Sequence, residues 1–150
     1  MPLPELNSEG YSDPGIYLAS LEEILQKFGT DSPAREQQGN LLRLIVERAR
    51  NYSTIKRVLI WGSFVSAKLE PGDLDYSIVV NPRHQITSIA QADSRFFTPI
   101  DAKIYYGVDK GYLVLYEYPP EYYAEAILFF CQDREGWLHG ILEVSCDGQN

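Results

Sequence analysis

The sequence predicts an α+β fold with a mixed β-sheet that carries the functional residues and helices packed on the sheet's other face. Two stretches in the first third of the chain combine helix-capping residues with apolar residues at helical spacing. Residues 58–80 then form a pattern of two apolar strands joined by turns. Further strand-like runs follow at 100–106, 112–118 and 138–144.

The composition indicates a single domain over residues 1–150. A chain of 150 residues can bury one core, and 45% hydrophobic with 23% charged residues is ordinary for a globular protein. The net charge of -8 repels polyanions, so extended binding to DNA or RNA is disfavoured. Without a membrane-length apolar stretch or a signal-peptide pattern, we expect a cytoplasmic protein that makes no membrane contact. Cys131 and Cys146 lack metal-ligand spacing and are expected to be unpaired thiols.

The first half of the chain is expected to hold a lead-in and two helices. We expect residues 1–17 to form an irregular lead-in, because prolines and glycines recur there. A helix is expected to begin at Ser20, which forms a capping-box pattern with Glu23. A second helix is expected from Ser32-Pro33 to about Arg50, with proline in its first turn. Its scattered arginines are expected on solvated faces or in surface pairs; they are Arg35, Arg43, Arg48 and Arg50.

The stretch from Val58 to Val80, VLIWGSFVSAKLEPGDLDYSIVV, holds the candidate site. After the first strand we expect a tight turn at Gly62 and Ser63, then a short helix, a Pro-Gly turn and the second strand. Gly62 lets the backbone approach a ligand closely, and the N–H groups that begin the helix suit a phosphate. Lys68 is placed to reach the same phosphate from the short helix.

Asp73 and Asp75 flank Leu74 where the second strand is expected to start. Side chains two residues apart in a strand share a face, so both carboxylates are expected to project together, with Ser77 extending the polar face. Two adjacent anions repel each other unless a cation lies between them, and a divalent metal with oxygen ligands meets this need. The predicted ions are magnesium, with manganese as the alternative.

A third acid, Asp101, lies in the apolar run PIDAKIYY, and Lys103 is expected on the same face, where it can neutralise a phosphate. The Gly-Ser turn, the Asp-x-Asp pair and Asp101 occur in one order, which favours a metal and phosphate site. The plainer interpretation is that Asp73 and Asp75 only line the solvated face of a strand. Residues 81–97 show a mixed pattern with some helical spacing, and His84 is expected at the surface. A last helix is expected after Pro119.

The order of these motifs resembles that of the nucleotidyltransferase superfamily, which includes DNA polymerase beta and the minimal nucleotidyltransferases. The shared pattern is a Gly-Ser turn, about ten further residues, Asp-x-Asp and a later acid in a strand. The resemblance implies the nucleotidyltransferase fold, a nucleoside triphosphate substrate and two magnesium ions. Carried over residue by residue, the turn that holds the triphosphate is Gly62 and Ser63. The metal-binding and catalytic acids are then Asp73, Asp75 and Asp101.

Nearly the whole chain is also similar to a group of small bacterial proteins of unassigned function. Their motifs are a PPGIH-like start, an RFG segment, a GSFVT-K-PxDxD core and a DREG-x-x-KG ending. The corresponding segments here are DPGIY (13–17), KFG (27–29), GSFVSAKLEPGDLD (62–75) and DREGWLHG (133–140). This similarity carries little information about the substrate.

The superfamily resemblance implies transfer of a nucleoside monophosphate to a hydroxyl of a protein or transfer RNA. Small members often work in toxin-antitoxin pairs or defence, so we expect a cognate toxin or antitoxin partner, or a homo-oligomer that completes the site. The acidic pI favours a protein or small-molecule acceptor over RNA. Two alternatives stay open. One is a catalytically inactive nucleotide-sensing or partner-binding module on the same fold. The other, ranked last because a histidine cluster is lacking, is a metal-dependent phosphohydrolase.

Overall fold

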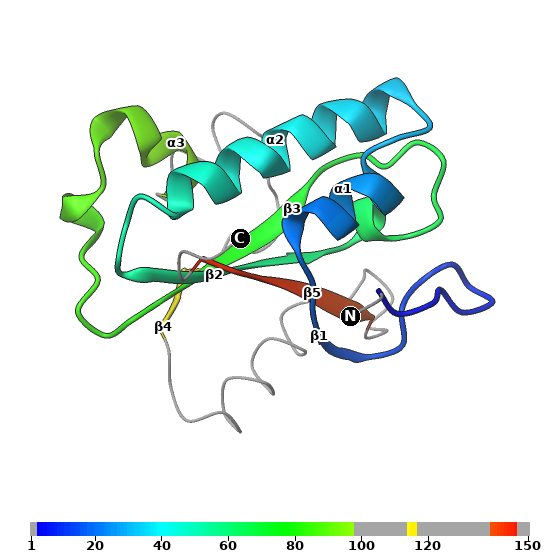
Figure 1. Ribbon diagram of the computed structural model, residues 1–150, viewed down its shortest axis with the longest axis horizontal. Coiled ribbons are helices and arrows are strands. Elements are labelled where there is room, and N and C mark those ends of the chain that lie inside the picture. The colour runs from blue at the N-terminus through cyan, green and yellow to red at the C-terminus, as the bar shows by residue number, and fades with distance from the viewer. Residues whose placement is uncertain (1–2, 98–113, 117–138, 147–150) are drawn as a thin grey trace.

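A mixed sheet of five strands is the framework of residues 3–97, 114–116 and 139–146, the part of the chain that the computed structural model describes (Figure 1). The strand order is β1-β5-β2-β3-β4. The central strand β2 is antiparallel to β5 and β3, whereas β1 and β4 add in parallel at the two edges. The strands are β1 (Gly15–Leu18), β2 (Ile55–Trp61), β3 (Asp75–Val80), β4 (Val114–Tyr116) and β5 (Gly140–Ser145). The predicted α+β class with a mixed sheet is therefore confirmed.

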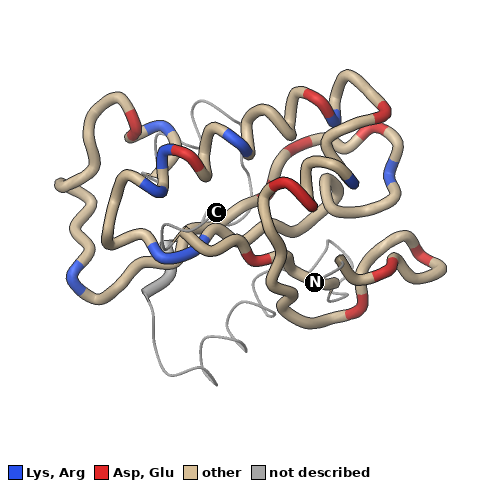
Figure 2. Tube along the Cα trace, in the orientation of Figure 1, with Lys and Arg blue, Asp and Glu red and all other residues tan. Residues whose placement is uncertain are grey.

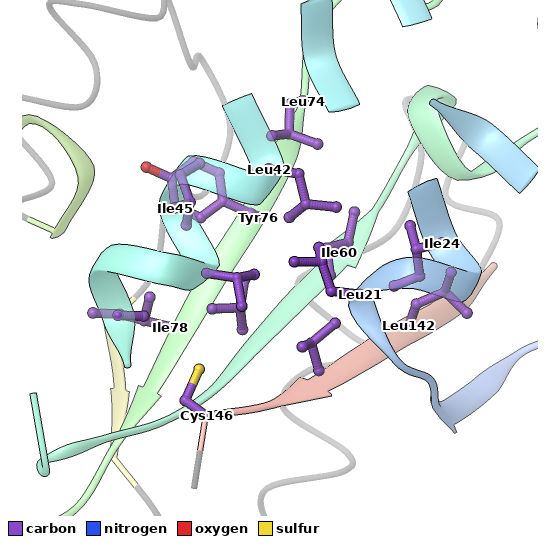
Figure 3. Packing of buried hydrophobic residues seen from close by; sticks show 14 of the residues in the cluster. Leu21, Ile24, Leu42, Ile45, Ile60, Leu74, Tyr76, Ile78, Leu142 and Cys146 are labelled. Carbon is purple, nitrogen blue, oxygen red and sulfur yellow. The ribbon is translucent and has the colours of Figure 1, made fainter. Parts of the chain in front are cut away.

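Two helices, α1 (Leu21–Phe28) and α2 (Pro33–Ala49), cover one face of this sheet (Figure 1). The side chains between the helices and the sheet are apolar and almost fully buried, and each such burial contributes roughly 1.5–3 kcal/mol. Figure 3 shows this core, to which both helices and three strands contribute; its labelled members include Leu21, Ile24, Leu42, Ile45, Ile60, Tyr76, Ile78 and Leu142.

The helices begin where their capping residues predict. The hydroxyl of Ser20 accepts a hydrogen bond from the Glu23 backbone N–H at 3.1 Å, and the Glu23 carboxylate accepts one from the Ser20 N–H at 3.0 Å. These bonds lower the pKa of Glu23, the backbone bond being the larger cause. Ser32 caps α2 by accepting from the Arg35 N–H, and Pro33 occupies the first turn. Local sequence therefore sets both starts.

Several strand boundaries differ from the prediction. The irregular lead-in of residues 1–17 ends at Pro14, because residues 15–17 belong to β1. β1 forms by pairing in parallel with β5, whose residues are far away in the sequence, so no local pattern marked it. β2 begins at Ile55, three residues before the predicted start. The expected final strand is confirmed as β5, and β4 lies within the expected strand 112–118.

The segment after β3 contains two short 3-10 turns. It holds η2 (Ile86–Ser88) and η3 (Gln91–Asp93) and ends in the short helix α3 (Ser94–Phe97). Its anchor is Tyr52, whose hydroxyl donates to the Asp93 carboxylate at 2.6 Å and accepts from the Ala90 N–H at 3.0 Å. The expected helical spacing is thus realised only at the end of the segment.

His84 is buried, which corrects the surface position that we expected for it. Its side chain is only 4% exposed, and Nδ1 lies 2.8 Å from the Thr54 hydroxyl. Its Nε2 atom has no hydrogen-bond partner among the described residues. Burial lowers the pKa of the imidazole because the charged form loses its hydration.

Some predictions fall on residues that the structure does not describe, namely the strand around Asp101, the helix after Pro119 and Cys131. Cys146 is buried. No helix in the described ranges has the length and apolar character needed to cross a membrane.

Truncation of a core side chain tests the packing of the central strand. Ile60 of β2 is fully buried between the sheet and the helices. Ile60→Ala should therefore lower the free energy of unfolding by about 2–5 kcal/mol in urea titrations. Leu69→Ala is the matched control, because Leu69 is 71% exposed and its loss should cost no more than about 0.5 kcal/mol. Equal losses in the two variants would contradict this packing.

The buried His84 predicts a defined pH dependence of stability. Its folded pKa is lowered, so the unfolded chain binds the proton first as the pH falls below about 6.5. The contribution of His84 is therefore fully present above that pH and declines as the pH falls towards the folded pKa. Thermal melts across pH 5 to 8 should show this slope in the wild type, and His84→Asn should flatten it. An unchanged slope in the variant would contradict the assignment.

Candidate functional site

Gly62 and Asp75 lie in direct contact where β2 ends and β3 begins. Trp61, the last residue of β2, pairs with Asp75, the first of β3, which places Asp75 beside the following glycine. Gly62 has a φ of 81°, a conformation that other L residues rarely adopt. A Cβ atom at this position would overlap the Asp75 carboxylate. Both the backbone angle and the neighbouring carboxylate therefore require glycine here.

Asp75 faces away from the helices. It is half-buried, and its register neighbour Trp61 belongs to an apolar cluster on that face, together with Leu59, Val79 and Ile141. Ser77 is next on this face, as expected for the polar side of β3. Its hydroxyl is buried and lacks a hydrogen-bond partner within the described ranges. The polar surface is thus narrow, because apolar side chains of the adjacent strand flank it.

The structure separates the remaining predicted residues. Asp73 is exposed and precedes β3, so strand geometry orients Asp75 but does not extend to Asp73. Lys68 is also exposed, on the connection between the two strands. Asp101 and Lys103 lie outside the described residues. Among the residues that are described, no three His, Cys, Asp or Glu side chains gather as metal ligands.

The short helix expected after the Gly-Ser turn is a single 3-10 turn, Ser63–Val65. Three residues align too few peptide dipoles to give an appreciable macrodipole, so the expected help from a helix N-terminus is wrong. The turn is closed instead by Ser66, whose hydroxyl donates to the Ser63 carbonyl at 2.6 Å and accepts from the Lys68 N–H at 3.1 Å.

Arg35 of α2 holds the β2–β3 connection, defined as residues 62–74. One terminal nitrogen of its guanidinium donates to the carbonyls of Phe28, at 3.1 Å, and Phe64, at 2.7 Å. The other terminal nitrogen donates to the carbonyls of Ser66, at 2.7 Å, and Lys68. A single side chain therefore joins the end of α1 to three carbonyls of the connection.

The charge of Arg35 is buried, which corrects the expectation that this arginine is solvated or in a surface pair. Its side chain is only 6% exposed, and in the described part of the chain it forms no ion pair. Burial lowers the pKa of the guanidinium, while Asp31 and Glu70 act in the opposite direction. Arginine nevertheless stays protonated in proteins, so a positive charge lies beneath the connection. The surface expectation holds for Arg43, which pairs with Glu22 at 2.9 Å.

One signal in the sequence pointed to Arg35. It lies in the first turn of α2, where the helix dipole disfavours a cation. A residue that opposes a local preference is often held by long-range contacts or by function. Figure 2 shows that the other basic residues of α2 alternate with acidic ones along the helix.

Two further contacts fix the connection. The Gln38 side-chain amide donates to the carbonyls of Pro71, at 2.8 Å, and Gly72, at 3.2 Å. From the N-terminal segment, the Gly10 carbonyl accepts from the Ala67 N–H at 2.9 Å. The next residue of that segment, Tyr11, stacks on His139 with ring centroids 3.8 Å apart. The N-terminal segment and α2 thus constrain the backbone between the two strands.

This geometry places a backbone that can accept a ligand next to a carboxylate. The Asp75 carboxylate occupies the space that a side chain at position 62 would fill, and its oxygen atoms suit a hard divalent cation. The buried charge of Arg35 lies on the inner side of the same connection. An anion bound together with a cation is the ligand class that this combination fits.

Comparison with known proteins identifies a family but no activity. The sequence model described as "Family of unknown function (DUF6932)" matches residues 4–145. No curated protein matches the chain, and no solved structure matches it.

Addition of one methyl group tests the contact between Gly62 and Asp75. Gly62→Ala should lower the free energy of unfolding by about 1–3 kcal/mol, because φ becomes strained and the carboxylate is displaced. Gly72→Ala is the matched control: a Cβ there meets no heavy atom within 4 Å, and we expect a change within about 0.5 kcal/mol. Adding Asp75→Ala to Gly62→Ala should recover part of the loss. Urea unfolding of these three variants and of the single variant Asp75→Ala measures the changes; if the losses from Gly62→Ala and Asp75→Ala simply added in the double variant, the contact would be contradicted.

Proposed function

Because the chain belongs to the DUF6932 family, whose function is unknown, we propose an activity from the geometry of its site. The protein is a metal-dependent nucleotidyltransferase that transfers a nucleoside monophosphate from a nucleoside triphosphate to an acceptor hydroxyl. The direct contact between Gly62 and Asp75 carries this proposal. It puts a backbone turn for the phosphates beside a carboxylate for the metal.

The proposed roles follow from the position of each residue. The turn at Gly62 and Ser63 would hold the phosphates, with exposed Lys68 reaching them from the same connection. Asp75 would bind metal, with Asp73 as a second ligand and Asp101, outside the described residues, as the third. Carboxylate oxygens fit magnesium. Two bound ions would stabilise the attacking hydroxyl and the pyrophosphate leaving group.

Two general features of the fold support the proposal: the face of the sheet on which Asp75 lies and the α+β class. Asp75 lies on the face opposite α1 and α2, so these two helices do not cover its carboxylate. The resemblance to the nucleotidyltransferase fold agrees with this α+β arrangement, which many other folds share. Both the turn and Asp75 come from one pair of neighbouring strands.

The acceptor is proposed to be a protein or transfer RNA hydroxyl, in a cytoplasmic toxin-antitoxin or defence setting. The net charge of -8 favours a protein acceptor, because a long polyanion would be repelled. A cognate toxin or antitoxin, or a second copy of the chain, would complete the acceptor side of the site. Lys103 would assist at the phosphates, again from outside the described residues.

A second candidate is an inactive nucleotide-sensing or partner-binding module on the same fold. The position of Asp73 favours it, since this carboxylate is exposed and precedes the strand that orients Asp75. Such a module would bind nucleotide without turnover. Labelled nucleotide that becomes attached to an acceptor would decide for the enzyme.

Removal of one charge from the site tests the proposal. Asp75→Asn keeps the shape of the side chain but removes the metal-binding anion, so magnesium-dependent binding of nucleoside triphosphates should fall at least about tenfold. Calorimetric titration with each of the four ribonucleoside triphosphates, in magnesium and in chelator, measures this. Glu47→Gln is the matched control, because this exposed carboxylate lies at the far end of α2. Wild-type binding by a folded Asp75→Asn variant would refute the site.

A further inference from the structure

The hydrogen bonds of Arg35 orient the peptide groups of the β2–β3 connection. In a trans peptide the C=O and the following N–H point in opposite directions. The guanidinium draws in the carbonyls of Phe64, Ser66 and Lys68, and thereby turns the N–H groups that follow them away from itself. Of these, the N–H of Val65 bonds to the Gly62 carbonyl and that of Ala67 to the Gly10 carbonyl. These peptide dipoles have their positive ends on the outer side of the connection.

The positive charge of Arg35, like these peptide dipoles, favours an anion on the side of the connection that faces away from Arg35. A buried guanidinium keeps its proton, and in the described part of the chain no carboxylate lies within ion-pair distance of it. Asp31 and Glu70 influence it only from a longer range. Among the described residues, four carbonyl groups and the Phe28 ring, whose centroid lies 6.0 Å from the guanidinium carbon, compensate this charge. Low-dielectric surroundings transmit its field better than water does. The outer side of the connection is therefore favourable for an anion.

Gln38 provides a neutral comparison within the same helix. It also donates to two carbonyls of the connection, those of Pro71 and Gly72, but carries no charge. Two residues of α2, one turn apart, thus hold successive parts of one connection. The part next to the Gly-Ser turn is held by the charged Arg35. Burying this charge costs desolvation free energy, although a neutral donor such as Gln38 can make the same kind of contact.

From this geometry we infer that Arg35 is the positioning residue of the Gly62–Lys68 turn, and that the ligand of this turn is a polyphosphate. The inference rests on the proposed function. Arg35 does not touch the ligand; it sets the backbone that binds the phosphates and supplies positive charge behind it. A polyphosphate fits better than a single carboxylate, because the full charge of Arg35 and the aligned peptide dipoles of the turn act together.

Calorimetric titration with inorganic tripolyphosphate and with ATP, both in magnesium, tests this inference. Arg35→Gln keeps a donor but loses the charge, and it should weaken the binding of both probes at least about tenfold. Arg35→Lys keeps the charge but not the planar fork, so its affinity should fall between those of the wild type and the glutamine variant. The matched control is Arg43→Gln, an arginine of the same helix in a surface pair, whose affinity should stay within about twofold.

The outcomes separate the two claims. Wild-type affinity in a folded Arg35→Gln variant would leave Arg35 with a structural role only and overturn the inference, while the proposed function stands. Absence of binding by the wild type to both probes would overturn the proposed function and the inference together.

A measurement on the wild type covers the case in which the Arg35 variants do not fold. Tripolyphosphate should shift the NMR signals of the Arg35 side chain and of the Val65, Ala67 and Leu69 amides. Shifts confined to other parts of the protein would overturn the inference.

Discussion

The buried guanidinium of Arg35 is the interaction on which the rest of the described structure depends. A charge removed from water must keep its hydrogen bonds, and Arg35 finds them in carbonyls of α1 and of the β2–β3 connection. These bonds hold α1, α2 and the connection in one arrangement. The path of the chain between β2 and β3 is therefore set from the helix layer, although the connection emerges from the sheet.

Much of the fold was predictable because its signals are local. Ser20 with Glu23, and Ser32 with Pro33, mark both helix starts through contacts that span three residues. The strands around residues 58–61 and 74–80 stood out through their apolar residues and the turns between them. β1 did not stand out, because its four residues form a strand only through pairing with β5. The sequence likewise contains no local sign that His84 is buried beside Thr54.

The candidate site was predictable only in its central part. Gly62 and Asp75 were both singled out by motif, and the structure brings them together through the register of β2 and β3. Their contact depends on that register and on a positive φ, neither of which a spacing rule contains. Arg35 was misjudged, since its partners are almost all about thirty residues away and a surface arginine is the ordinary case. The roles of Asp101 and Lys103 stay predictions.

The pairing of β1 with β5 also constrains how the chain reaches its final form. Residue 15 pairs with residue 140, so β1 cannot pair until a strand far along the chain has been synthesised. Helices α1 and α2 and the antiparallel β2–β3 pair need only neighbouring segments, which form quickly. On the ribosome, the earlier elements can assemble around Arg35 while the edge of β2 that will receive β5 is still open. Closure of the sheet is thus a late step of folding, and until then the chain exposes an unpaired strand edge that is prone to aggregation.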